Sequence, residues 1–162
     1  MGEGSPDAVA IAIGEAPGAV EEVRHQPFVG SAGLIYRRYF LHGIEQKVFT
    51  TNILSCRPPR NRIPSPEEID NCQDRLTELF LILKPTLLVF FGNVARDAFK
   101  SNLTERGVIE GHDPGCVWLY HPSYLLRQGG SLQRSPGTIA STALEQYANI
   151  ASIIAAYPLP TS

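Results

Sequence analysis

Two polar side chains occur where apolar stretches of the chain end, and both could act on a bound ligand. Asn52 lies within the apolar residues 50–54, and a buried amide must be hydrogen-bonded to some partner. It is therefore either a structural amide tied to the backbone or a group that recognises the polar edge of a ligand. His121 directly follows the apolar residues 117–120. An imidazole at the end of a strand can donate a hydrogen bond to developing negative charge, which is a catalytic role.

Loops rich in glycine, proline or arginine follow these apolar stretches. Residues 14–33 contain the sequences GEAPG and QPFVGSAG, whose glycines let backbone N–H groups approach a ligand and suit an anion at the start of a helix. Phe28 in this loop is either a core residue or a functional one. A second loop carries Arg57, Arg60 and Arg62, and its prolines would hold these arginines out toward phosphates unless the loop is simply a solvated surface.

The third loop, residues 121–135, begins with the sequence HPSYLLR. Leu125 and Leu126 follow a turn, so they are either core residues or an exposed apolar wedge of the kind that enters a stack of nucleic-acid bases. Tyr124 adds a bulky ring that could alter strand or base contacts. The loop therefore combines a candidate donor with a candidate wedge.

Four apolar runs predict the strands that position these loops, at residues 9–13, 50–54, 87–91 and 117–120. Helices are expected over residues 32–42, over residues 65–84, from about Asn93, and after Ser135 and Pro136. Ser65 and Glu68 have the spacing of a capping box. The alternation predicts an α/β fold, a three-layer α/β/α sandwich around a central, mainly parallel four-stranded sheet. In such a fold, ligands bind beyond the carboxyl ends of the strands.

The composition limits the class of protein. With 162 residues, 43% of them hydrophobic, the chain is expected to form one domain over residues 1–162, with residues 1–7 as a flexible tail. The 14 basic and 16 acidic residues give a net charge of −2, so a site for a polyanion must be local. Three cysteines and no leader pattern favour a reducing cytoplasm without disulfides. The apolar runs fall short of the roughly 20 residues that cross a bilayer, so no membrane partner is expected, and a monomer is the default.

Taken together, the three loops resemble the uracil-DNA glycosylase superfamily, and most closely its family 4. The motifs that carry the resemblance are GEAPG, PFVGSAG, TNILSCRPPRNRIP, the helix start PEEI and HPSYLLR, in this order between residues 11 and 127. The resemblance implies a monofunctional DNA glycosylase with DNA as its partner. It would flip a pyrimidine, in the first place uracil, out of DNA and hydrolyse its N-glycosidic bond to leave an abasic site.

The resemblance also implies a role for each matching residue. Phe28 would stack on the flipped base, Asn52 would hydrogen-bond its pairing edge, and His121 would face the departing base, so these three groups should converge at one end of the sheet. Glu15 would be the third catalytic residue, near the C5 edge of the base or the sugar. Ala16 replaces the aspartate that positions water in the superfamily's most active members, and Leu125 would be the wedge. The other base-binding residues would be Gly14 and Gly18, and the other DNA-binding residues Ser31, Arg57, Arg60, Arg62, Ser123 and Arg127.

Family 4 members resemble iron–sulfur proteins with four cysteine ligands. Cys56 and Cys72 match the downstream pair of these ligands, whereas Cys116 is out of place and residues 1–13 contain no cysteine. Four thiolates are needed and three cysteines exist. We therefore expect two reduced, buried thiols, no metal and no cofactor.

Three other functions are compatible with the sequence. The amide of Asn52 can turn either way round, so it can match uracil or cytosine, and an open wall around Glu15 and Gly18 would admit a bulkier base. The chain could then excise hydroxymethylated or glucosylated cytosine from phage DNA as antiviral defence. A non-catalytic DNA-binding module is a further alternative, but it needs neither Asn52 nor His121. A nucleotide-binding protein of doubly wound type is the third alternative, although the first loop has no Gly-x-Gly-x-x-Gly fingerprint and the chain has no Gly-x-x-x-x-Gly-Lys.

Overall fold

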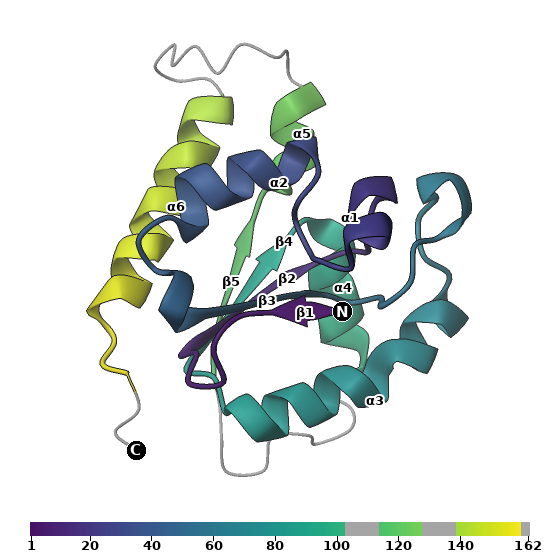
Figure 1. Ribbon diagram of the computed structural model, residues 1–162, viewed down its shortest axis with the longest axis horizontal. Helices are drawn as coiled ribbons and strands as arrows, with labels where there is room; N and C mark the ends of the chain where they lie inside the picture. The colour runs from purple at the N-terminus through teal and green to yellow at the C-terminus, as the bar shows by residue number, and fades with distance from the viewer. Residues whose placement is uncertain (103–113, 128–138, 160–162) are drawn as a thin grey trace.

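A five-stranded sheet forms the centre of the computed structural model, which describes residues 1–102, 114–127 and 139–159 (Figure 1). Its strands lie in the order β1-β3-β2-β4-β5. All neighbouring strands are parallel except β1, which pairs antiparallel with β3. The predicted three-layer, mainly parallel sandwich is confirmed, but the predicted count of four strands is wrong. The strands are β1 (Gly2–Glu3), β2 (Ala10–Gly14), β3 (Val48–Asn52), β4 (Leu87–Phe91) and β5 (Gly115–Leu119).

The additional strand lies in the segment that the sequence predicted to be a flexible tail. Gly2 and Glu3 pair with Thr51 and Thr50 of β3, so this prediction is wrong at the start of the chain. A carboxylate oxygen of Glu3 also accepts a hydrogen bond of 2.6 Å from Arg37. Backbone hydrogen bonds and one ion pair, rather than apolar packing, hold this edge strand in place. A glycine followed by a glutamate has no apolar pattern, so the sequence did not indicate a strand here.

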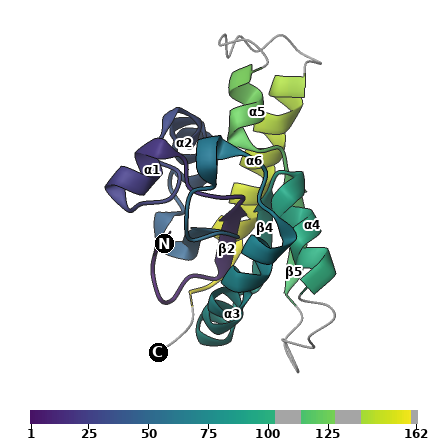
Figure 2. The ribbon, with the colours of Figure 1, turned by 90° about the vertical axis from the view of Figure 1, so that its right-hand side faces the viewer.

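The two faces of the sheet are covered by different helices (Figure 1). Alternating residues of β2 explain this arrangement: Ala10 and Ala12 pack on one face, Ile11 and Ile13 on the other. On the first face lie α2 (Ser31–Tyr36), its π-helical continuation (Arg37–Leu41), α5 (Pro122–Arg127) and α6 (Ile139–Ala156); on the second lie α3 (Pro66–Leu83) and α4 (Asn93–Asn102). Helix α1 (Ala19–Arg24) stands outside the sandwich beside α2 (Figure 2), and 3-10 turns occur at Glu45–Lys47 and Pro59–Asn61.

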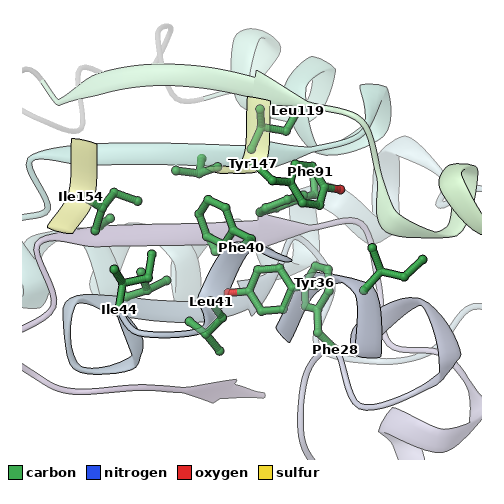
Figure 3. Packing of buried hydrophobic residues seen from close by; sticks show 14 of the residues in the cluster. Phe28, Tyr36, Phe40, Leu41, Ile44, Phe91, Leu119, Tyr147 and Ile154 are labelled. Carbon is green, nitrogen blue, oxygen red and sulfur yellow. The ribbon is translucent and has the colours of Figure 1, made fainter. Parts of the chain in front are cut away.

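An aromatic cluster fills the layer between the sheet and the first set of helices. Figure 3 shows Tyr36 and Phe40 facing Phe91 of β4 and Tyr147 of α6. The ring centroids of Phe40 and Phe91 are 5.1 Å apart, in edge-to-face contact, and those of Phe91 and Tyr147 are 5.4 Å apart. This cluster reaches the carboxyl end of the sheet, because Phe28 packs on Tyr36 at 4.5 Å.

Helix α3 forms as its sequence predicts. Ser65 caps it, accepting from the Glu68 amide at 3.3 Å, while the Glu68 carboxylate accepts from the Ser65 amide at 2.8 Å. The helix ends at Lys84, whose φ of 44° is left-handed, directly before Pro85. The predicted capping box is thus confirmed. The predicted start of the C-terminal helix, at Ser135 and Pro136, lies outside the described residues.

The parallel strands end together at one edge of the sheet. In the register of the sheet, Gly14 pairs with Asn52, and Phe91 pairs with Leu119. The loops after these strands therefore meet beyond that edge. No helix among the described residues has the length and apolar character needed to span a membrane. The single domain, the monomeric state and the cytoplasmic location remain predictions.

Candidate functional site

A cleft of about 1000 Å³ opens beyond the carboxyl ends of the strands, and its walls come from the loops after β2, β3, β4 and β5. Phe28, Asn52 and His121 all line this cleft. The structure therefore brings together the three groups that were expected to converge. The other predicted residues that line it are Glu15, Ala16, Gly18, Arg62, Ser123 and Arg127.

Gly14 lies between the aromatic ring and the amide. A methyl group added at this position would stand 2.4 Å from Oδ1 of Asn52 and 2.6 Å from Cζ of Phe28. Neither distance is tolerable for real atoms, so a side chain here would displace one of the two groups. Gly14 thus allows Phe28 and Asn52 to occupy the same corner of the cleft.

The ring of Phe28 is held in place by its own unusual backbone. Its φ of 53° is left-handed, which is strained for a residue with a side chain. Two features support this conformation. The Arg37 guanidinium donates to the Phe28 carbonyl at 2.9 Å and to the Pro27 carbonyl at 3.1 Å. Gly33 packs against the same peptide, since a Cβ there would lie 2.0 Å from the Phe28 carbonyl oxygen.

Asn52 presents a buried amide to the cleft. The residue is only 3% exposed, and no hydrogen bond to its side chain occurs within the part of the chain that the structure describes. Its side-chain oxygen and nitrogen are not among the fully buried atoms without a partner, so they reach the surface of the cleft. Its backbone, by contrast, is fixed, because Arg75 of α3 donates to the Asn52 carbonyl at 2.6 Å and to the Thr51 hydroxyl at 3.1 Å. Buried amides are almost always satisfied in folded proteins. The free donor and acceptor of Asn52 are therefore suited to a polar ligand.

The imidazole of His121 is neutral and has a defined proton. The backbone N–H of Ser123 lies 3.1 Å from Nδ1 and can only donate, so Nδ1 is the acceptor and Nε2 carries the proton. The Ser123 hydroxyl, which accepts from Arg127 at 3.2 Å, lies 2.8 Å from the same Nδ1. Burial, and to a smaller extent the positive charge of Arg127, lowers the pKa of His121 to about 4, although the charge of Glu21 opposes this effect. The ring thus offers Nε2–H as a hydrogen-bond donor.

Two carboxylates stand in the same cleft. Burial raises the pKa of Glu15, and the charge of Arg127 opposes this effect. Oε1 of Glu21 accepts from the backbone amides of Val29 and Gly30, at 3.1 and 2.7 Å. Glu21 therefore ties helix α1 to the loop that carries Phe28.

Two arginines of the basic loop have partners within the protein. Arg62 forms two hydrogen bonds with Glu68, at 2.7 and 2.8 Å, and this pairing lowers the pKa of Glu68 to about 2. Arg57 binds Asn61 at 2.7 Å and approaches Glu22 at 3.5 Å. Acidic and amide neighbours thus bind the guanidinium groups of Arg57 and Arg62, and contact of the three arginines with phosphates stays a prediction. Arg60 is exposed, outside the cleft.

The predicted wedge is a core residue. Leu125 is 4% exposed and packs in the same cluster as Phe28 and Phe91. Residues 122–127 form a helix in which Pro122 and Leu125, one turn apart, both face inward. Leu126, the neighbouring leucine, is 37% exposed. Ser31, the remaining predicted contact, is exposed at the start of α2 but does not line the cleft.

Some residues of the site escaped the sequence analysis. Arg75 fixes the end of β3 from a helix that lies 22 to 24 positions later in the chain. Glu21 reaches 8 and 9 positions ahead to its amide partners. Neither contact follows a helical or strand period, so no local pattern points to it.

The cysteines do not fit an iron–sulfur cluster in the described residues. Cys56 is exposed, and Cys72 and Cys116 are half-buried. No group of three or more histidine, cysteine, aspartate or glutamate side chains with the arrangement of a metal site occurs in residues 1–102, 114–127 and 139–159. Four thiolates would be required. The prediction of reduced thiols without a cofactor stays a prediction, although Cys56 is not the buried thiol that was expected.

Comparison with known proteins places this site in a family. Residues 1–142 match the family model described as "Uracil DNA glycosylase superfamily". A "Type-4 uracil-DNA glycosylase" from Pyrobaculum aerophilum is 34% identical over 142 residues, covering 78% of this chain and 72% of that protein. The protein of the same name from Thermotoga maritima is 35% identical over 141 residues, with 78% and 71% covered. The Archaeoglobus fulgidus protein of that name is 38% identical over 96 residues, which are 58% of this chain and about half, 48%, of its own length. These names give no support to the modified-cytosine alternative.

Proposed function

Because this chain belongs to the uracil-DNA glycosylase superfamily, we propose that it excises uracil from DNA. In this reaction the uracil is flipped out of the strand, its N-glycosidic bond is hydrolysed, and an abasic site is left. One observation supports the proposal most directly. The amide of Asn52, which makes no side-chain hydrogen bond within the described residues, lies in one cleft with the ring of Phe28 and the neutral imidazole of His121.

Each of the three groups would bind a different part of the base. The Phe28 ring would stack on its face, since an aromatic ring suits any planar base. The Asn52 amide would donate to the uracil O4 and accept from its N3–H, an arrangement that satisfies both groups and leaves O2 for another donor. Nε2–H of His121 would donate to O2. The base edge would thereby satisfy the donor and acceptor of Asn52.

Cleavage would follow from support of the leaving group. As the bond between C1′ and N1 breaks, its electron pair moves to the base, and the sugar becomes positively charged. A neutral donor at O2 interacts more strongly with the resulting anion than with the neutral base, so it lowers the barrier. Water then attacks C1′, and the proton that it loses passes through solvent to the uracil anion, which leaves as neutral uracil. The carboxylate of Glu15, in the same cleft, would stabilise the positive sugar, whereas the methyl of Ala16 cannot hold water.

A set of base-modified oligonucleotides tests this function. Under single-turnover conditions, we expect uracil to be removed, and the strand to break at that site only after treatment with alkali, because a monofunctional glycosylase leaves the backbone intact. Matched strands carrying hydroxymethylcytosine or glucosylated cytosine serve as controls and should remain whole. Folded protein that leaves uracil in place, or removes only a modified cytosine, would refute the proposal.

We predict that the His121 ring stays neutral from pH 8 to pH 5. Its pKa of about 4 lies below its unperturbed value of 6.5. Between these values the unfolded chain takes up a proton that the folded chain does not, so this histidine's contribution to stability is complete above about pH 6.5 and declines as the pH falls toward 4. Long-range ¹H–¹⁵N correlation spectra of the ring, assigned by comparison with His121→Gln, should show a proton on Nε2 alone at pH 5. A ring that titrates near 6.5, or that carries its proton on Nδ1, would contradict the donor role.

A further inference from the structure

A second group of aromatic rings extends from the cleft, beyond the stacking ring of Phe28. Trp118, Tyr120 and Tyr124 all line the cleft that contains His121. Trp118 and Tyr120 are each 43% exposed, and Tyr124 is half-buried. Large aromatic side chains that keep this much exposed surface beside a binding cleft are typical of a contact region for a ligand.

The strand β5 determines how these rings are arranged. Side chains alternate along a strand, so Trp118 and Leu119 point to opposite sides of β5, and Leu119 is buried in the core. Tyr120 directly follows the strand. Trp118 lies over the ring of Phe90 at 6.3 Å, with an angle of 24° between the planes.

Tyr120 and Tyr124 form a stacked pair. Their ring centroids are 5.4 Å apart and their planes are 16° from parallel. The pair flanks the catalytic candidate His121 in sequence, and the Tyr124 amide donates to the His121 carbonyl at 2.9 Å. The hydroxyl of Tyr147 donates to the Tyr120 carbonyl and so fixes the backbone that carries the Tyr120 ring. Nearly parallel rings of this kind present flat surfaces of the sort on which bases stack.

Positive charge accompanies the rings. Arg96 and Arg127 line the same cleft, although Arg96 also contacts Asp97 at 2.8 Å, and the carboxylates of Glu15 and Glu21 face the cleft as well. Aromatic rings for bases with arginines for phosphates are the combination found in proteins that bind single-stranded nucleic acid. In a duplex, base faces are already stacked on one another and are not available to such rings.

We propose that Trp118, Tyr120 and Tyr124 form a stacking surface for the bases next to the target nucleotide in single-stranded DNA. The inference deepens the proposed function by naming the form of its substrate, and it rests on that function in taking DNA as the ligand. The target base would enter beside Phe28, while its unpaired neighbours would lie along β5. The protein should therefore bind single strands better than fully paired duplexes.

The single tryptophan of the chain provides a direct measurement. Titration of the protein with a thymidine oligonucleotide that contains no uracil should quench Trp118 fluorescence in a saturable way, at constant ionic strength. The same sequence in a blunt duplex should quench much less. Equal quenching by both forms, or no quenching by either at concentrations that bind, would overturn the proposal.

Tyr124→Ala is expected to weaken binding of the single strand about tenfold, because loss of one stacking ring costs this much or more. Tyr124→Phe keeps the ring and should bind as the wild type does. Tyr39→Ala is the matched control, because Tyr39 is another partly buried tyrosine of the same core cluster but does not line the cleft. If Tyr39→Ala weakens binding as much as Tyr124→Ala does, the stacking surface is refuted.

These readouts separate the two proposals. Binding and quenching use DNA without uracil, so they do not require catalysis. Protein that is quenched by single strands but never excises uracil would refute the proposed function and leave the stacking surface intact. Protein that excises uracil equally from both forms, without a change in Trp118 fluorescence, would refute the stacking surface alone.

Discussion

His121→Ala is expected to reduce single-turnover excision of uracil by at least about a hundredfold, because loss of a donor to a developing oxyanion typically costs about 3 to 4 kcal/mol. The effect should fall on the rate of bond cleavage more than on DNA binding. The neutral base makes only a weak hydrogen bond to Nε2–H, and the departing anion makes a strong one. Rates measured with enzyme in excess over a uracil-containing strand isolate this step.

His42→Ala is the matched control for this substitution. The side chain of His42 is 85% exposed and its residue lies outside the cleft, so its removal should leave the rate unchanged. Thermal unfolding of both variants shows whether the fold is retained. Cleavage at the wild-type rate by folded His121→Ala would exclude the proposed support of the leaving group.

Asn52→Ala should cause a loss of similar size, at least about a hundredfold in single-turnover excision. The substitution removes both the donor and the acceptor that would bind the pairing edge of the uracil. It therefore leaves the polar groups of the bound uracil without partners in a buried site. The backbone at this position should persist, since Arg75 binds the carbonyl rather than the side chain. The fold should therefore tolerate the change better than is usual for a buried residue.

Asn71→Ala controls for loss of an amide as such, because Asn71 is an exposed residue of α3 that does not line the cleft. It should retain the wild-type rate. Binding of uracil-containing DNA by Asn52→Ala can be measured separately in the His121→Ala background, where cleavage is slow. An Asn52→Ala protein that is folded and fully active would show that another group recognises the base.

The position of the site depends on small residues as much as on the reactive ones. A methyl group at Gly14 would collide with the side chains of Asn52 and Phe28, and a methyl group at Gly33 would collide with the Phe28 carbonyl. Both positions therefore need glycine for this close packing. The glycines of the first loop were interpreted from the sequence as residues that allow close approach to a ligand. The structure shows that they also allow close approach of the protein's own groups, which places the ring and the amide in one corner of the cleft.

The sequence by itself determined the elements and the end of the sheet at which the site forms. Apolar runs placed β2 and β4, in which every residue is buried, and the Ser65 capping box placed the start of α3. These features are local, since a strand or a helix start is encoded by residues a few positions apart. Parallel strands then end at one edge, which predicts that the loops after them meet there, and the family resemblance assigned Phe28, Asn52 and His121 to one site in those loops.

Only the tertiary structure decided how individual side chains are used. It buried Leu125, paired Arg62 with Glu68, joined the first residues to the sheet and assigned the proton of His121 to Nε2. It also brought Trp118, Tyr120 and Tyr124 to the wall of the same cleft. Each of these outcomes depends on which face of a helix or strand turns inward, or on a contact with a residue that the repeat of a helix or strand does not specify. Packing between distant segments determines both, and the sequence encodes that packing only through the complete fold.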